Sequence, residues 1–274
     1  MTFESIKLAN RIRARIVSGA SITPSRGSHL GGSLSCVDLL ASIASVFSIS
    51  TSPSRYDQTF LVLSKGHACL SLYSLLVEIG LMSSTAFNSL QQNGSKLGGH
   101  PTRDLTQGIT VSTGSLGLGI SHSVGQALFL KSKFPNNTPF VCCVIGDGES
   151  SEGIVHESLN LASFHSLSNL LIFLDNNKYQ QTGLTANISN PIIWHDYCNS
   201  LNLNYINIVD GHDHDQLVPT IMKVMNSQST GRPTFFNCNT IKGYGCPSLS
   251  VDNSGHYTTL TADQLDDFYS RYPL

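Results

Sequence analysis

The sequence has little charge and almost no excess of either sign. Only 12% of its 274 residues are Asp, Glu, Lys or Arg, and the formal net charge is −2. This balance excludes the basic surface with which proteins usually bind nucleic acid. A lone globular domain usually carries about 25% charged residues. The deficit therefore predicts either a surface that a partner covers or a polar surface built from Ser, Thr and Asn.

Long hydrophobic runs are also missing. No apolar run approaches the roughly 20 residues that a membrane-spanning helix needs. Near the N-terminus, Lys7, Arg11, Arg13 and Arg15 interrupt any stretch that could act as the apolar core of a signal sequence. We therefore expect a cytoplasmic protein without a membrane segment.

The seven cysteines form no Cys-x-x-Cys pair, and their number is odd. A zinc site or a redox pair is therefore not expected. Cys142 and Cys143 lie inside the apolar run Phe140–Ile145. This position predicts reduced cysteines in the core of a cytosolic protein.

Short apolar runs alternate with helical patterns along the chain. The expected strands cover residues 60–63, 140–145, 170–174, 205–209 and 234–239, with helices near residues 8–16, 37–44, 68–79, 120–131, 155–162 and 216–225. The alternation predicts an α/β fold in which helices cover both faces of a parallel sheet. Without a linker or repeat, residues 1–274 are expected to form one domain. Residues 25–33 and 91–119 are expected to be Gly-rich loops, and long loops in compact domains are usually functional.

A Gly-Asp-Gly-Glu segment, residues 146–149, follows the expected strand 140–145 and precedes a helix. Glycines let the backbone approach a ligand, and a helix N-terminus attracts phosphate oxygens. Asn177 and Tyr179 follow the next expected strand. If the strands are neighbours, the Asp147 carboxylate, the Asn177 amide oxygen and the Tyr179 carbonyl would surround one Mg²⁺ with phosphate oxygens and water. Alone, Gly-Asp-Gly is also an ordinary turn.

Taken together, residues 146–153 and 174–183 resemble the thiamine-diphosphate motif of the transketolase family. Other segments resemble further family motifs in the right order: Arg26–Ser35, Leu63–Ala68, Gly98–Pro101, Gly114–Gly119, Asp210–Asp213 and Thr240–Gly245. Leu118 stands where family members usually carry Gln, and the segment before His256 is only loosely similar.

The resemblance implies a thiamine-diphosphate-binding fold, specifically its diphosphate-binding domain, and a set of cofactor contacts. These are His67, Gly114, Ser115, Leu116, Gly146, Asp147, Gly148, Glu149, Asn177, Tyr179 and His256. The implied metal ligands are Asp147, Asn177 and Tyr179, which hold Mg²⁺, with Ca²⁺ or Mn²⁺ as substitutes.

The same resemblance implies catalytic roles for four histidines. His29, His100 and His256 would hydrogen-bond the carbonyl and hydroxyl oxygens of a donor substrate, and His67 and His256 would contact the diphosphate. A lone loop histidine is more often a solvated surface residue. The remaining histidines are expected to be structural or superficial: His122, His156, His165, His195, His212 and His214.

Glu152 and Glu157 have two interpretations. Glu152 could simply favour the N-terminus of the helix that follows it. In the resembled family, both positions belong to a carboxylate network that crosses a subunit interface.

The resemblance also implies a missing half. In the family, a glutamate of a pyrimidine-binding domain activates the cofactor, and this chain stops at Leu274, before such a domain. We expect that domain on a separate partner chain, in an α2β2 heterotetramer of a two-component transketolase. The Ser64–Ala68 segment looks most like the N-terminal subunits of such enzymes. A truncated chain would show the same boundary.

Three functions remain open at this stage. The first is ketol transfer from a small sugar or keto donor to an aldehyde. The second is the alpha subunit of a 2-oxoacid dehydrogenase, against which the Ser64–Ala68 and Gly98–Pro101 loops argue. The third is a non-catalytic cofactor-binding or regulatory subunit.

Overall fold

The computed structural model describes residues 1–22, 27–50, 58–227, 231–250 and 255–273. In this part of the chain, six parallel strands form one sheet in the order β1-β2-β3-β4-β6-β5. The strands are β1 (Ile49–Ser50), β2 (Thr59–Leu63), β3 (Val141–Gly146), β4 (Leu170–Asn176), β5 (Asn204–Ile208) and β6 (Thr234–Asn239). The expected parallel sheet is confirmed, and each expected strand agrees within two residues.

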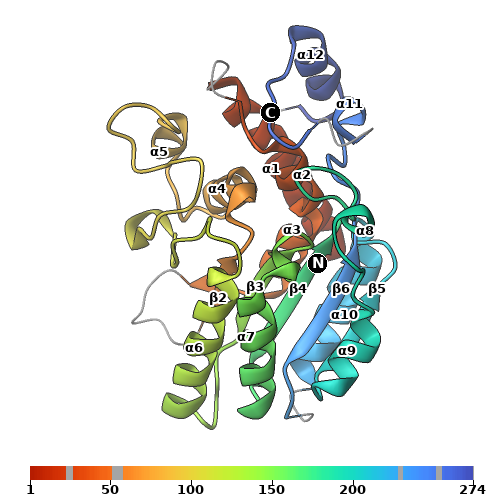
Figure 1. The fold of residues 1–274 in the computed structure, drawn as a ribbon. Coiled ribbons are helices and arrows are strands. Elements are labelled where there is room, and N and C mark those ends of the chain that lie inside the picture. Colours follow the sequence, from red (N-terminus) through yellow and green to blue (C-terminus); the bar gives the residue numbers. More distant parts are fainter. Residues whose placement is uncertain (23–26, 51–57, 228–230, 251–254, 274) are drawn as a thin grey trace.

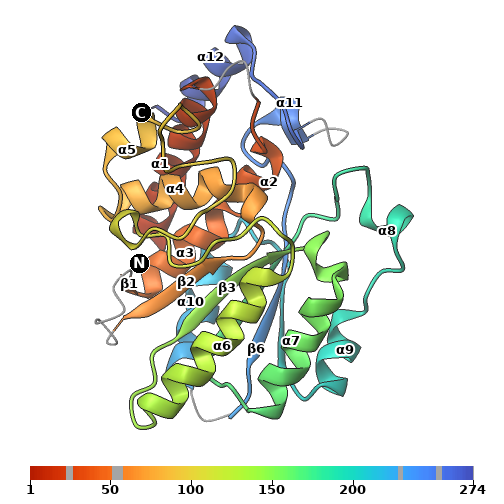
Figure 2. The same ribbon diagram turned by 60° about the vertical axis from the view of Figure 1, so that its left-hand side comes forward.

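Helices cover both faces of the sheet (Figure 1). On one face lie α6 (Leu118–Lys133), α7 (Gly153–Phe164) and α9 (Trp194–Ser200). The other face carries α1 (Thr2–Ile22), α2 (Leu30–Ser35), α3 (Val37–Val46), α4 (Cys69–Glu78) and α10 (His214–Asn226). Shorter elements complete the description: η1 (Gly66–Ala68), α5 (Ser84–Asn88), η2 (Leu105–Gln107), η3 (Glu149–Ser151), α8 (Thr185–Ile188), α11 (Pro247–Ser250) and α12 (Ala262–Arg271). Figure 2 shows α1, α3 and α4 on the side of the sheet away from α6 and α7.

The period-two alternation of β3 divides the core into two clusters. Cys142 and Val144 face the α1–α3 side, whereas Val141, Cys143 and Ile145 face α6 and α7. Every side chain of β3 is buried, as expected for a central parallel strand covered on both faces. The prediction that Cys142 and Cys143 belong to the core is confirmed.

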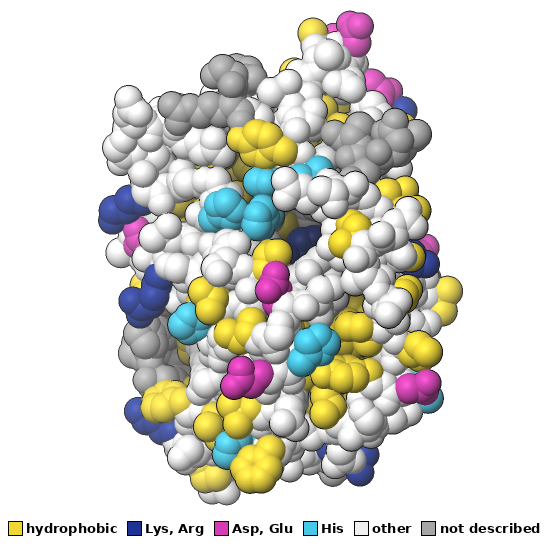
Figure 3. Space-filling model, in the orientation of Figure 1, with side chains coloured by type: hydrophobic (Ala, Val, Ile, Leu, Met, Phe, Trp, Pro, Cys, Tyr) yellow, Lys and Arg dark blue, Asp and Glu magenta, His cyan; other side chains and the backbone are white. Residues whose placement is uncertain are grey.

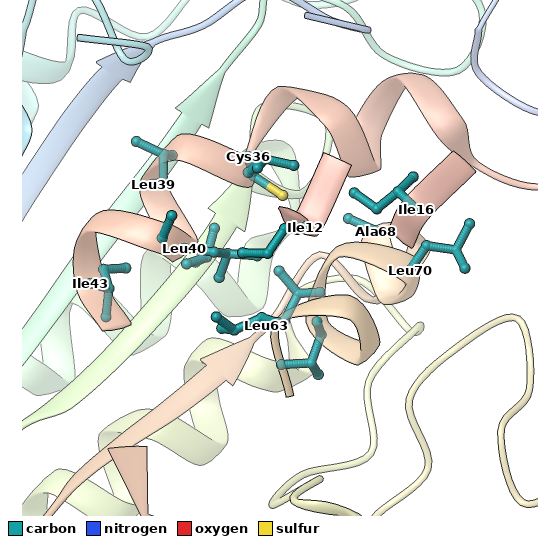
Figure 4. Packing of buried hydrophobic residues seen from close by; sticks show 14 of the residues in the cluster. Ile12, Ile16, Cys36, Leu39, Leu40, Ile43, Leu63, Ala68 and Leu70 are labelled. Atoms are coloured by element: carbon teal, nitrogen blue, oxygen red, sulfur yellow. The ribbon is translucent and has the colours of Figure 1, made fainter. Parts of the chain in front are cut away.

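The larger cluster packs α1 against α3 and α4, as Figure 4 shows around Ile12, Leu40 and Leu63. Ile12, Ile16 and Leu40 are fully buried, so α1 is pinned by its i, i+4 apolar stripe. This packing holds α2 and η1, which carry site residues, against the end of the sheet.

The prediction of a loop at residues 25–33 is wrong in part. Residues 25–33 were expected to be irregular, but α2 begins at Leu30. Leu30 and Leu34 are fully buried on one face of that helix, and the intervening glycines hide this i, i+4 pair in the sequence. Ser25 and Arg26 lie outside the described residues. The expected loop 91–119 is mostly irregular but contains η2 and the start of α6.

Candidate active site

The turns that follow three strands open at one edge of the sheet. The register pairs Gly146 of β3 with Asp175 of β4, and Asn176 of β4 with Asn239 of β6. Parallel α/β sheets bind their ligands at this carboxyl edge. The register therefore brings Asp147 and Asn177 to the same place, as the sequence predicted.

A hollow of about 340 Å³ lies at this edge. Its lining includes predicted site residues from both halves of the chain, namely His29, His67, Leu116, Gly146, Asp147, Gly148, Glu149, Glu152, Asn177, Tyr179 and His256. Figure 3 shows its mouth, with histidine side chains gathered above it and a Lys or Arg side chain deep inside. The space is large enough for a diphosphate with part of an organic cofactor.

Asp147 is the most conspicuous group in the hollow. The residue is only 6% exposed, and its Oδ2 has no hydrogen-bond partner. Burial, and then the neighbouring Asp175, raise the pKa of Asp147 to about 7, although Lys65 opposes the shift. A buried carboxylate oxygen without a partner fits a ligand position for a hard cation.

Asn177 is buried beside it and is held in one orientation. Its amide nitrogen donates to Asp175 Oδ2 and to Ser35 Oγ, each at 3.4 Å. Its Oδ1 accepts the Tyr179 N–H at 3.1 Å. Lys178 adopts a left-handed φ of 66° between them. This tight turn places the amide oxygen of Asn177 and the backbone carbonyl of Tyr179 at the hollow. Oxygen atoms of these two types are suitable ligands for Mg²⁺.

Two buried lysines lie in the hollow, and sequence reasoning missed both. Lys65 and Lys242 are 7% and 5% exposed. Lys65 forms an ion pair with the fully buried Asp175, which also accepts hydrogen bonds from Ser35 (2.6 Å) and Thr240. Burial, and then the neighbouring Lys65, lower the pKa of Lys242 to about 8. Both lysines stand in segments that resembled family motifs, which was the available signal.

The four predicted histidines come together from separate segments. The His29 ring centroid lies 4.8 Å from that of His67, 5.9 Å from His100 and 5.3 Å from His256. His67 and His100 are 4.5 Å apart. His29 precedes α2, and His67 lies in η1 rather than in a loop. Residues 251–254, which precede His256, lie outside the described part.

The histidine cluster favours neutral imidazoles. Burial and then the neighbouring His67 lower the pKa of His29 to about 3. Burial and then Lys242 lower the pKa of His256 to about 4, and burial also lowers the pKa of His67. Lys242 Nζ lies 3.2 Å from His256 Nδ1. Neutral rings near pH 7 can both donate and accept hydrogen bonds.

A second hollow, of about 400 Å³, lies beside the same cluster. His29 and His100 line it together with Gln91, Cys69 and Tyr257. Among the described residues, the first hollow is lined by charged side chains, whereas the lining of the second is polar and largely uncharged. His29 borders both hollows, so the histidine cluster lies between them.

The Gly114–Gly119 loop approaches the cluster from another side. Gly114 has φ 134°, and a Cβ there would lie 2.9 Å from the His100 ring. Leu116 lines the charged hollow, whereas Ser115 and Leu118 are exposed. The close approach explains why glycine occupies position 114.

Glu149 is buried, and its carboxylate bonds to the protein itself. It accepts the Gly117 N–H at 2.7 Å, the Gly146 N–H at 3.2 Å and the Ser64 hydroxyl. Burial raises the pKa of Glu149. The two carboxylate oxygens of Glu149 thus already accept three hydrogen bonds, and its predicted cofactor contact stays a prediction.

Glu152 and Glu157 are placed differently. Glu152 is the exposed N-cap of α7 and lines the hollow, whereas Glu157 is exposed on α7 outside that lining. The six histidines expected to be structural or superficial do not line it either. No group of three or more His, Cys, Asp or Glu side chains in the described residues is arranged to hold a metal. The predicted ligand set contains one carboxylate and would not form such a group.

Residues 6–273 match the family profile described as "Transketolase, thiamine diphosphate binding domain". The chain therefore belongs to the transketolase family. It is 33% identical to the 6-deoxy-6-sulfo-D-fructose transketolase subunit SqwG of a Clostridium species, covering 86% of this chain and 84% of that protein. It is 28% identical to an apulose-4-phosphate transketolase subunit of Phocaeicola vulgatus, over 97% of this chain and 93% of that one.

Longer relatives match over part of their length. The chain is 33% identical to transketolase-like protein 2 of Bos taurus across 95% of this chain, and it spans 41% of that protein. A solved transketolase variant from Pichia stipitis superposes with a TM-score of 0.89 at 26% identity, over 98% of this chain and 41% of that chain. The transketolase of Leishmania mexicana gives 0.85 at 25%, with 98% and 41% covered. The expected fold class is thus confirmed. In the described residues, no helix is long and apolar enough to cross a membrane.

Proposed function

We propose that the chain is the N-terminal subunit of a two-component transketolase. It binds thiamine diphosphate through Mg²⁺ and transfers a two-carbon ketol unit from a ketose-type donor to an aldehyde acceptor. The observation that carries this proposal is the unpartnered oxygen of buried Asp147, which shares one hollow with two buried lysines and three of the four clustered histidines.

The chemistry of the hollow supports a metal-bound diphosphate. Asp147, Asn177 and the Tyr179 carbonyl would hold Mg²⁺, for which Ca²⁺ or Mn²⁺ can substitute. Lys65 and Lys242 would offset the remaining diphosphate charge. Gly148 also lines the hollow, where its backbone can approach the diphosphate. Bound thiamine diphosphate supplies the nucleophilic carbon that ketol transfer requires.

The histidines would bind and orient the donor. The rings of His29, His100 and His256 can donate hydrogen bonds to carbonyl and hydroxyl oxygens and exchange protons with them. His67 and His256 lie in the charged hollow, where they can contact the diphosphate. Glu152 and Glu157 would join a carboxylate network with another subunit.

A partner chain would supply the pyrimidine-binding domain. The related transketolase subunits of the Clostridium species and of Phocaeicola vulgatus match this chain over 84% and 93% of their own lengths. Exposed apolar side chains beside the site offer a surface for such a partner, including Leu118 at 39% and Ile241 at 50%. We propose one domain over residues 1–274, an α2β2 heterotetramer and a cytoplasmic location.

The decisive experiment assays the purified chain with cofactor, Mg²⁺ and ketose donors, first alone and then with the candidate partner. We expect turnover only in the second case. Calorimetry should show that Asp147→Ala and Asn177→Ala lose Mg²⁺-dependent cofactor binding in the complex while both remain folded. Robust turnover by the chain alone, free of host transketolase, would reject the two-component interpretation. Wild-type cofactor affinity in either variant would reject the metal assignment.

A further inference from the structure

Glu149 joins three segments of the site that are distant in sequence. Its Oε1 accepts the Ser64 hydroxyl and the Gly117 N–H at 2.7 Å, and its Oε2 accepts the Gly146 N–H at 3.2 Å. Ser64 extends the junction, because its Oγ accepts the Ile120 N–H at 3.0 Å. Glu149 is 2% exposed, so these bonds do not compete with bulk water.

Each segment carries a different part of the site. Ser64 directly precedes Lys65 and η1, which contains His67. Gly117 ends the loop whose Gly114 lies against His100. Gly146 directly precedes Asp147. One carboxylate therefore fixes the metal-binding turn relative to the histidine cluster and to the Gly114–Gly117 loop.

The segments are also packed too closely for larger residues. A Cβ on Gly119 would lie 2.4 Å from Ser64 Cα, and one on Gly66 would lie 2.5 Å from the Gly114 backbone nitrogen. Gly117 has φ 84°, and a Cβ there would lie 2.2 Å from Ile154. Close packing of this kind, together with the hydrogen bonds to Glu149, leaves the three segments little room to move relative to one another.

The junction requires a carboxylate. Three donors converge on Glu149, and an ionised carboxylate offers acceptors on both oxygens. A glutamine would keep one acceptor oxygen and turn an NH₂ group toward the N–H of Gly146 or Gly117. That arrangement leaves a buried donor unpaired, which is unfavourable.

We propose that Glu149 is a positioning residue: it sets the distance between the metal-binding turn and the Gly114–Gly117 loop and does not itself contact cofactor. The proposal rests on the proposed function for the meaning of these two segments. It assigns to Glu149 an effect on turnover that is separate from cofactor affinity, because misplacing reacting groups by about 1 Å can cost roughly 100-fold in rate.

The first test is hydrogen exchange of the isolated chain without cofactor. In Glu149→Gln, the amide of Gly117 or of Gly146, whichever then faces the glutamine NH₂ group, should exchange at least about 10-fold faster, as expected when a buried hydrogen bond worth roughly 1.4 kcal/mol is lost. Glu4→Gln, at an exposed position of α1, is the matched control. Unchanged exchange at both glycines would overturn the proposal. If Glu149→Gln does not fold, Glu149→Asp replaces it: its shorter side chain keeps the carboxylate but cannot reach all three donors, so exchange at Gly117 or Gly146 should accelerate.

The second test uses the complex with the partner. At saturating cofactor and Mg²⁺, Glu149→Gln should lower kcat roughly 10- to 100-fold, with a change of no more than about 3-fold in cofactor affinity and donor KM. Unaltered kcat, or a loss confined to cofactor affinity, would overturn the positioning role. A wild-type complex that binds no thiamine diphosphate would instead refute the proposed function, while the exchange result would still report on the junction.

Discussion

Two buried aspartates have opposite environments. Asp38 on α3 is 2% exposed, and its oxygens meet Arg13, His212 at 2.7 Å and His214 at 2.9 Å. These partners outweigh burial and hold the pKa of Asp38 well below its usual range. Asp147 is buried to a similar degree, yet one of its oxygens has no partner and its pKa is raised to about 7.

Hydrogen-bond pairing distinguishes the two carboxylates more clearly than burial does. The Asp38 network joins α1, α3 and α10, and His212 Nε2 also accepts the Ile241 N–H at 2.9 Å. Both Asp38 oxygens are paired in this network, although the buried Arg13 Nε has no hydrogen-bond partner. Pairing of both carboxylate oxygens stabilises one arrangement of the core. An unsatisfied buried carboxylate is costly to keep. Its retention at the edge of the sheet is explained if a cation completes it.

The largest effect should come from Asp38→Ala. The change leaves the buried Arg13 charge without its partner, which costs about 3–5 kcal/mol of unfolding free energy. Urea denaturation of the isolated chain measures this loss. Asp38→Asn, which keeps an acceptor oxygen, should lose less than Asp38→Ala. A loss below about 1 kcal/mol in Asp38→Ala would show that the two aspartates do not differ as described.

Asp147→Asn should behave in the opposite way. Removing a buried charge that has one unpartnered oxygen should leave the unfolding free energy at pH 8 unchanged or slightly higher. Affinity for Mg²⁺ and thiamine diphosphate should fall on the order of 100-fold, since a charged ligand is lost. Urea denaturation measures the unfolding free energy, and calorimetry with the partner present measures the affinity. Asp266→Asn, at an exposed position, is the control for both. Clear destabilisation without any loss of affinity would reverse the assignment.

The histidines sharpen the comparison within the site. His29→Ala and His100→Ala should lower turnover roughly 10- to 100-fold with a smaller loss of cofactor affinity, because both line the second hollow, and only His29 also borders the charged one. Steady-state kinetics of the complex measures this, and the exposed His195→Ala provides the control. Unchanged turnover and donor affinity in both variants would remove them from the reaction.

The last comparison concerns pH. The pKa values of His29 and His256 are lowered from 6.5 to about 3 and about 4 in the folded state. Below pH 6.5 the unfolded chain therefore binds protons that the folded chain does not, so stability falls as the pH drops from about 6.5 toward 4. The double variant His29→Gln with His256→Gln should show a shallower fall in urea midpoint across this range. An equal slope in both proteins would contradict the lowered pKa values.

Much of the fold could be predicted because β2, β3 and most of β4 are nearly continuous apolar runs. Helix α12 was not predicted, although Thr261 and Gln264 form a capping box at its start, which is a sequence-level signal. Helix α2 was missed because glycines separate its two buried leucines. Alternating strands and helices revealed the architecture, whereas short helices without a clear apolar period left little trace.

The site was predictable where a motif names a residue and unpredictable where a distant partner decides its role. Asp147, Asn177 and the four clustered histidines were expected in one place. The ion pair between Lys65 and Asp175 joins residues 110 positions apart, and no local pattern predicts it. Glu149 stands in the motif itself, but only the structure shows that three segments donate to it.

All seven cysteines are unpaired and buried, and burial raises the pKa of each thiol, to about 11 for Cys36 and to about 12 for Cys69 and Cys198. Thiolates are the species that alkylating reagents attack, so the native protein should react with them only when it opens. Because the thiols are spread over the sheet and its covering helices, their separate labelling rates would report which layer opens first. The chain thus contains its own set of probes for local unfolding, already in place without any engineered label.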